Sequence, residues 1–214
     1  MKVEKREKRD YRVSQWSGGT TTEFLLFPES ASYAARNFLW RVSSATVELA
    51  ESDFTLLPDY RRYLTPLSGD LELSRGGAAF ASLPALDVLA FDGGEAVKSR
   101  GQVTDFNLML RKGAAEGGMA TLQLRADREV FLSTMLENAA KEAEVVLLYC
   151  FSGAFRLQQR DGLSECRAGA CLVLQREAGD RQKEAFAFRL QGIEEQTTLA
   201  LVWMQRKRKD PENF

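Results

Sequence analysis

An arginine lies in the middle of a run of residues typical of a β-strand. Residues 38–48 are rich in aromatic and β-branched side chains, and with a period of two they place Arg41 and Ser43 on one face. The same face carries Arg41, Ser43, Ala45 and Val47. A guanidinium buried in a sheet needs an anionic partner, because leaving it unpaired costs several kcal/mol. Two partners are open: an acid of the chain such as Glu23 or Asp105, or the carboxylate of a bound ligand.

A second run, residues 104–111, alternates polar with apolar side chains. One face carries Asp105, Asn107 and Met109, and the other face is fully apolar. Asp and Asn are disfavoured within strands. Their presence on one face therefore indicates a polar network inside a barrel, with an exposed sheet edge as the alternative.

Two turns carry further candidate residues. Trp16 precedes a Gly-Gly pair and the run that leads from Thr20 to Glu23, and paired glycines permit positive φ and a close approach of backbone. No Gly-Lys-Ser/Thr motif or helix start follows, so a phosphate cradle is a weak interpretation and a plain hairpin turn remains open. The turn that begins at Pro58 places Arg61 or Arg62 at the head of a strand, where one of them could guard a barrel mouth or simply be solvated.

The 214-residue chain contains no histidine. Ser-His-Asp and Cys-His nucleophile systems are therefore excluded, as is any metal site built on imidazole. The three cysteines are odd in number, and four residues separate Cys166 from Cys171, so neither a disulfide framework nor a zinc knuckle is indicated. An all-carboxylate calcium or magnesium site stays open, but no Asp-rich loop has the spacing of an EF-hand. We expect no metal and no cofactor.

Charge gives no sign of a polyanionic partner. The chain has 29 Lys+Arg against 30 Asp+Glu, a net charge of −1, so neither nucleic acid nor an anionic membrane is an expected partner. The first ten residues are charged and no apolar region follows them, which argues against a signal peptide. The longest apolar run, residues 145–151, is far shorter than the roughly 18 residues that a membrane span needs. We expect a cytoplasmic protein.

The rest of the chain predicts many short strands separated by turn residues, a pattern that favours an all-β sandwich or barrel over βαβ units. The strands are expected at residues 23–27, 38–48, 54–57, 61–67, 71–74, 86–91, 96–100, 103–110, 121–125, 145–151, 154–158, 171–175, 185–190 and 198–205. Only residues 133–144 have the composition of a helix.

A faint internal repeat points to a duplicated barrel. The stretch Leu67-Ser-Gly-Asp-Leu-Glu-Leu73 aligns with Phe151-Ser-Gly-Ala-Phe-Arg-Leu157 at an offset of 84, and residues 86–89 align with 171–174 at an offset of 85. Chance similarity is the alternative. Strand, tight turn, strand and a later closing strand are typical of the double-stranded β-helix, the cupin architecture. We therefore predict a bicupin of two cupin-like barrels, residues 1–117 and 118–214, each either packed shut or holding one small ligand.

These segments together resemble the HutD/Ves family, a bacterial bicupin family linked to histidine utilisation. The resemblance covers residues 12–112. The motifs that carry it are Trp16-x-Gly-Gly-Thr20-x-x-Glu23, Phe38-x-Trp-Arg-x-Ser43-x-Ala-Thr-Val47, Phe54 with Pro58 and Arg61, Leu67-x-Gly69, and Thr104-Asp-Phe-Asn-x-Met109 followed by Arg111. The chain departs from the family in two turns, with Ser17-Gly18-Gly19 for the usual Asn-Gly-Gly-Gly and Pro58-Asp-Tyr-Arg-Arg62 for the usual Pro-Gly-x-Asp-Arg.

The resemblance implies a metal-free pair of cupin-type barrels with a regulatory or accessory role. A carboxylate intermediate of histidine breakdown, of the urocanate or formiminoglutamate class, is the implied ligand, and a second branch of the family is described as induced by environmental stress. The implied pocket residues are Trp16, Thr20, Glu23, Arg41, Ser43, Arg61, Asp105 and Asn107.

We expect a small-molecule binding protein without catalysis. In this hypothesis Arg41 grips a ligand carboxylate, Glu23 and Asp105 accept N–H groups, and Trp16 covers a planar group. One alternative is a metal-independent isomerase, lyase or hydrolase that uses Glu23 or Asp105 as general base and Arg41 as an electrostatic clamp. The other alternative is a protein-interaction module whose barrels are packed shut. Homodimer formation stays open.

Overall fold

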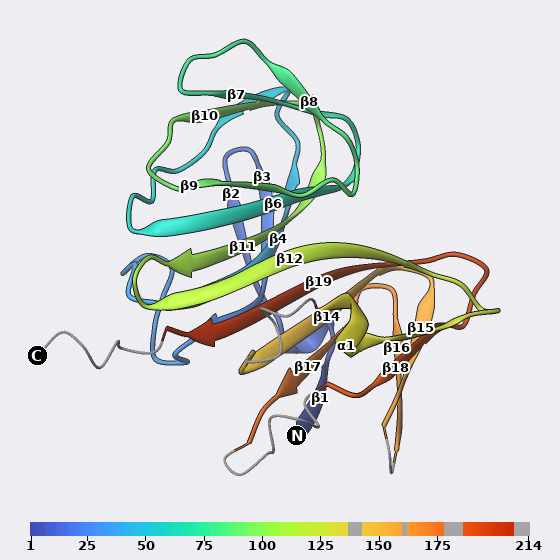
Figure 1. Cartoon of the computed structure of the whole chain (residues 1–214). Helices are drawn as coiled ribbons and strands as arrows, with labels where there is room; N and C mark the ends of the chain where they lie inside the picture. Colours follow the sequence, from blue (N-terminus) through green and yellow to red (C-terminus); the bar gives the residue numbers. More distant parts are fainter. Residues whose placement is uncertain (137–142, 160–161, 178–185, 208–214) are drawn as a thin grey trace, which may run out of the picture. The chain divides into compact units, whose positions relative to one another are not determined.

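Alternating side chains and closely spaced turns produce an all-β chain, as predicted. The computed structural model describes residues 1–136, 143–159, 162–177 and 186–207 (Figure 1). The chain divides into two compact units. One unit combines Met1–Arg12 with Gly117–Met204, and the other combines Val13–Glu116 with the chain from Gln205 onward. No helix in the described part is long and apolar enough to cross a membrane.

The Val13–Glu116 unit contains two sheets. The larger has the strand order β2-β3-β4-β11-β6-β9, with bounds β2 Arg12–Trp16, β3 Gly19–Phe27, β4 Trp40–Val47, β11 Thr104–Arg111, β6 Tyr60–Ser68 and β9 Leu89–Asp92. The smaller has the order β5-β10-β7-β8, with bounds β5 Glu51–Asp53, β10 Val97–Arg100, β7 Leu71–Arg75 and β8 Ala81–Leu83. Strands β4 and β11 lie at the centre of the larger sheet, so they position whatever their inner faces carry.

The core of this unit lies on both sides of the central strands. On one face of the sheet Phe24 stacks on Phe106 with ring centroids 5.7 Å apart, and Val42 on β4 is fully buried. A second cluster packs Leu64 and Phe91 against residues of the smaller sheet. The polar side chains in the middle of β4 and β11 are buried, namely Arg41, Ser43, Ser44, Asp105 and Asn107. Each of them therefore needs a hydrogen-bonding partner.

The Gly117–Met204 unit also contains two sheets. The first has the order β1-β17-β14-β19-β12, with bounds β1 Lys2–Arg6, β17 Cys171–Gln175, β14 Val145–Ser152, β19 Thr197–Arg206 and β12 Ala115–Leu124. The second has the order β13-β18-β15-β16, with bounds β13 Glu129–Phe131, β18 Arg189–Gly192, β15 Ala154–Gln158 and β16 Leu163–Arg167. An apolar cluster that includes Phe155, Leu172 and Leu201 fills the core between them.

Several expected elements need correction. Residues 54–57 are not a strand; the strand of that region is β5, which precedes them. Its Glu-Ser-Asp sequence is polar because β5 is an edge strand, so it carries no apolar signal. The expected helix reduces to one turn, α1 Leu132–Met135, and most of the remainder lies outside the described residues. Strand pairing gives two separate sheets in each unit, so closure into two barrels stays a prediction.

Candidate functional site

A cavity of about 310 Å³ opens on the inner face of β4 and β11 in the Val13–Glu116 unit. Its volume is at the lower end of the range typical of small-molecule sites. The face predicted from period-two spacing lines it: Arg41, Ser43, Ala45 and Val47 from β4, and Asp105, Asn107 and Met109 from β11. The cavity also receives Arg62 from β6, Tyr33 from the loop after β3, and Trp16 and Thr21 from the β2–β3 hairpin.

Strand register explains why these side chains meet. In the β4–β11 pair, Arg41 lies opposite Met109 and Ser43 lies opposite Asn107. In the β11–β6 pair, Arg62 lies opposite Met109. Residues directly opposite one another in an antiparallel pair point to the same face. Two arginines and an amide from three adjacent strands are thereby directed into one cavity.

Arg41 is held by the chain itself. Its Nε donates to Glu23 Oε2 at 2.7 Å and its Nη1 donates to Ser43 Oγ at 3.1 Å. The guanidinium also lies over the Tyr33 ring, 4.4 Å from the centroid. Only 7% of the Arg41 side chain and 13% of the Glu23 side chain are exposed. Of the two outcomes left open for Arg41, the internal ion pair with Glu23 is therefore the observed one.

Arg62 is equally buried but has no acid within ion-pair distance in the described part of the chain. Arg62 is 6% exposed. Nη2 donates to Asn107 Oδ1 at 3.2 Å, Nη1 makes a long contact of 3.5 Å with the Thr55 carbonyl, and the buried Nε has no acceptor. The guanidinium lies over Phe54 at 4.9 Å. Burial lowers the pKa of Arg62 to about 10, so the group remains a cation at neutral pH.

A short hydrogen-bond chain joins Arg62 to Asp105. Asn107 accepts from Arg62, and its Nδ2 donates to Asp105 Oδ1 at 2.6 Å. The backbone N–H of Ala45 donates to the same carboxylate oxygen at 3.1 Å. Burial raises the pKa of Asp105 to about 6, although these hydrogen bonds and the charge of Arg62 act in the opposite direction. The cavity thus holds a carboxyl group that changes charge close to neutral pH.

Aromatic side chains form the less buried part of the cavity lining. Trp16 is 40% exposed and Tyr33 is 37% exposed. A methyl group built on Gly18 would collide with the Trp16 ring, which shows that the indole lies directly against this glycine. These rings offer flat apolar surfaces to the organic part of a ligand.

The structure brings together five of the eight predicted site residues at the cavity: Trp16, Arg41, Ser43, Asp105 and Asn107. Glu23 contacts Arg41 but does not line the cavity. Thr21 lines it in place of Thr20, and Arg62 in place of the exposed Arg61. Whether any of these residues binds a ligand stays a prediction.

The sequence left Arg61 and Arg62 open at this turn, and the predicted pocket set named Arg61, although a signal that favours Arg62 was present. Tyr60 and Leu64 share its parity on β6, and both are buried apolar residues. Period-two alternation with these two neighbours selects Arg62 for the inner side and leaves Arg61 outside. Tyr33 carried no such signal, because it lies in an irregular loop.

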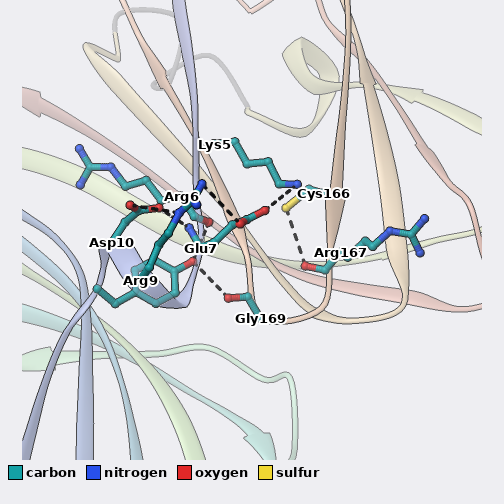
Figure 2. A network of polar contacts seen from close by, with 9 residues as sticks. Lys5, Arg6, Glu7, Arg9, Asp10, Cys166, Arg167 and Gly169 are labelled. Atoms are coloured by element: carbon teal, nitrogen blue, oxygen red, sulfur yellow. Dashed lines mark hydrogen bonds and ion pairs between the residues drawn. The ribbon is translucent and has the colours of Figure 1, made fainter.

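The polar network of the other unit is not a comparable site. Lys5 pairs with Glu7 at 2.9 Å, and the Glu7 backbone N–H donates to Asp10 Oδ2 at 2.9 Å. These residues form a partly exposed cluster near Cys166 (Figure 2). Burial raises the pKa of the Cys150 thiol to about 12 and that of Cys171 to about 11. Such thiols are protonated and shielded, and among the described residues no group of His, Cys, Asp and Glu could hold a metal ion.

Comparisons with known proteins agree on fold and family. The family model HutD matches residues 8–196 of the chain. No curated protein sequence matches it.

Solved structures resemble the chain over nearly its whole length. A conserved protein of unknown function from Pseudomonas aeruginosa PAO1 has a TM-score of 0.75 and 20% identity, covering 96% of this chain and 100% of that one. HutD from Pseudomonas fluorescens SBW25 has a TM-score of 0.72 and 19% identity, covering 97% and 100%. A cupin 2 conserved barrel domain protein from Leptotrichia buccalis has a TM-score of 0.55 and 10% identity, covering 96% and 98%.

At these identities the structural likeness establishes a cupin-like fold and no more. The family model is the stronger finding, because it spans most of the sequence, including the segments that form the cavity. The chain therefore belongs to the HutD family.

Proposed function

We propose that this HutD-family chain is a metal-independent binding protein for a small carboxylate-bearing metabolite. The ligand occupies the cavity of the Val13–Glu116 unit, and the protein acts in the cytoplasm in a regulatory or accessory role in histidine utilisation. The bicupin arrangement, with one cupin-like barrel in residues 1–117 and one in 118–214, is part of the proposal. The observation that supports it best is the buried cation of Arg62, which lines the cavity without an ion-pair partner among the described residues.

A ligand carboxylate supplies what Arg62 lacks. A guanidinium has five N–H donors, and only two of those on Arg62 have acceptors in the described structure. A planar carboxylate can accept two parallel hydrogen bonds from such a group, and charge-assisted bonds of this kind are strong away from water. Arg41, which the sequence suggested as the main ligand for the carboxylate, is less suited to that role because Glu23 already neutralises its charge.

The remaining lining suits a short organic anion. Trp16, Tyr33 and Phe54 present aromatic faces, while Ser43 and Asp105 provide groups that can bond to N–H or O–H. A molecule of the urocanate or formiminoglutamate class combines a carboxylate with a planar nitrogen-bearing group. Such a molecule places its carboxylate at Arg62 and its nitrogen-bearing group between the aromatic faces and Asp105.

Calorimetric titration with urocanate and formiminoglutamate tests the proposal. Arg62→Met removes the charge and keeps the apolar stem, so we expect it to weaken binding at least about tenfold. The matched control is Arg61→Met, because Arg61 is the exposed neighbour on the same strand; it should change affinity less than about twofold. Removing a buried cation that lacks a direct ion-pair partner should not unfold the chain, which circular dichroism checks. No binding to the wild type, or equal binding to Arg62→Met, would refute the proposal.

A metal-independent enzyme is the second candidate, and one observation favours it. Asp105 lies in the cavity with its pKa raised to about 6, in the range useful to a general base. Analysis of the ligand recovered after titration separates the two candidates. Unchanged ligand supports a binding protein, and a product that fails to form with Asp105→Asn supports an enzyme.

A further inference from the structure

The orientation of the Asn107 amide is fixed by its neighbours. Arg62 can only donate hydrogen bonds, so the Asn107 oxygen must face its Nη2 at 3.2 Å. The amide nitrogen is then directed at Asp105 Oδ1, 2.6 Å away. The Ala45 N–H is a second obligatory donor to that oxygen. Asp105 Oδ1 is therefore held as an acceptor in every protonation state of the carboxyl group.

It follows that a proton on Asp105 must reside on Oδ2. This second oxygen has no hydrogen-bond partner in the described part of the chain, and the residue lines the cavity while being only 4% exposed. The carboxyl group can thus interact with a ligand in two ways. Without a proton Oδ2 accepts a hydrogen bond, and with a proton it donates one.

The positive charge of the cavity can balance one anion, either the ionised Asp105 or a bound ligand, but not both. Arg41 on β4 is neutralised by Glu23 on β3 at 2.7 Å. Arg62 on β6 faces one nearby acid, Asp105, through the Asn107 amide. Asp53 on β5 lies at the rim, exposed and paired with Lys98 at 3.3 Å, and Tyr33 is the other titratable group of the lining. An anion bound at Arg62 would add a negative charge beside Asp105 in a site shielded from water.

We propose that a small oxyanion without a cationic group of its own binds at Arg62 together with one proton, which Asp105 takes up from solvent on Oδ2. The neutral carboxyl then donates a hydrogen bond to the bound anion, while Arg62 supplies the charge. Asp105 thereby becomes a specificity-determining residue that couples ligand affinity to pH. The inference rests on the proposed function, because it assumes the anion site at Arg62.

The direction of the coupling is set by the two forms of the protein. In the free protein the pKa of Asp105 is about 6, and a neighbouring anion raises it further. Above about pH 6 the free carboxyl is charged and must be protonated on binding, so affinity falls as pH rises, by about tenfold per pH unit. Below about pH 6 the carboxyl already carries its proton and the dependence on pH disappears.

Formate is the appropriate probe, because it is the smallest carboxylate and stays ionised above pH 6. Its dissociation constant is measured by titration at several pH values between about 6.5 and 8 for the wild type and for Asp105→Asn. An asparagine at this position imitates the protonated acid: its oxygen accepts from Ala45 and Asn107 and its NH₂ points into the cavity. We therefore expect wild-type affinity to fall about thirtyfold over this range. The affinity of Asp105→Asn should stay constant and exceed that of the wild type at pH 8.

The outcomes separate this inference from the proposed function. Formate binding that requires Arg62 but does not depend on pH would refute only the proton uptake, as would an unchanged pH slope in Asp105→Asn. No formate binding at any pH would refute the anion site itself. If Asp105→Asn does not fold, the ¹³C resonance of the Asp105 carboxyl decides the matter in the wild type. Saturating formate should move its titration upward, and a midpoint that does not move contradicts the inference.

Discussion

Arg41 and Arg62 are buried to the same extent, yet one is saturated by the chain and the other is not. Glu23 reaches Arg41 because it lies opposite Ser43 in the β3–β4 pair. No acid occupies the equivalent place beside β6 among the described residues, where the neighbours of Arg62 are Asn107 and the aromatic Phe54. A single difference in cross-strand partner thus separates a structural ion pair from a candidate ligand-binding cation.

Glu23→Gln tests the structural role of the Arg41 pair. The substitution leaves a guanidinium that is 7% exposed without its counter-charge, so we expect the unfolding free energy to fall by roughly 3–5 kcal/mol. Glu95→Gln is the matched control, since Arg75 and Glu95 are also 2.7 Å apart but the Arg75 side chain is 40% exposed. It should cost less than about 1 kcal/mol. Equal losses in urea denaturation would contradict the assignment of Arg41 to the buried framework.

Parity predicted much of the site at this scale. Four polar side chains that line the cavity, Arg41, Ser43, Asp105 and Asn107, lie on the faces that period-two spacing selected. Parity selects Arg62 over Arg61 when it is counted from Tyr60 and Leu64, which are both buried. The predicted strand began at Arg61, so Tyr60 was not used and the choice stayed open. The Tyr33 contact with Arg41 depends on the path of a loop, and no periodic signal encodes such a path.

At the scale of elements, the β2–β3 hairpin connects the rim of the cavity to the central sheet. Gly19 has φ of +147°, and a Cβ there would collide with the backbone carbonyl of Thr46 on β4. Gly18 has no such constraint on its φ, and a Cβ there would meet side-chain atoms of Trp16 and of Leu49, the latter at 2.7 Å. The first glycine therefore supports strand pairing, and the second supports the position of an aromatic ring.

Alanine substitutions at these two glycines should have different effects. Gly19→Ala must displace β4 or strain its own backbone, so we expect a loss of roughly 2–4 kcal/mol of stability. Gly18→Ala can be accommodated by moving the partly exposed Trp16, so the loss should be below about 1 kcal/mol while acrylamide quenching of tryptophan fluorescence increases. Urea denaturation and quenching are measured on both variants. Similar stability losses would contradict the assignment of Gly19 to strand pairing and of Gly18 to the position of the Trp16 ring.

The elements that sequence reasoning found are those with an apolar face. Strands such as β4, β11 and β14 alternate or are fully apolar because they lie inside sheets. The strands that it missed or misplaced have little apolar periodicity. For example, all five residues of the edge strand β2 are exposed, so burial imposed no pattern that could be read. The pairing of β1 with β17 joins residues about 170 positions apart, and no local signal predicts such a contact.

For the whole molecule, the absence of histidine simplifies the dependence of stability on pH. No side chain in the sequence has an ordinary pKa between 5 and 8. Burial raises the pKa of Asp105 to about 6. Hydrogen bonds act in the opposite direction on other acids, and those from Arg6 lower the pKa of Glu4. Asp105 therefore titrates in a range in which no side chain type of this sequence ordinarily does.

Protonated Asp105 should consequently contribute to the stability of the wild type, and this contribution should fall as pH rises. The pKa of Asp105 is raised from an ordinary 3.8 to about 6 in the folded chain, so the folded state binds the proton more tightly than the unfolded state. The contribution is fully present below the unfolded pKa and is lost as pH rises through about 6. Between about pH 4.5 and 7.5 it amounts to about 2 kcal/mol.

Comparison with Asp105→Asn isolates the contribution of Asp105, because the two proteins share every other titratable group. The unfolding free energy of the variant relative to the wild type should increase by about 2 kcal/mol between about pH 4.5 and 7.5. Asp127→Asn is the control, since its carboxylate is 70% exposed and should show no such change. A constant difference between Asp105→Asn and wild type would mean that burial does not hold the proton on Asp105. The cavity would then lack the neutral carboxyl that proton-linked anion binding requires.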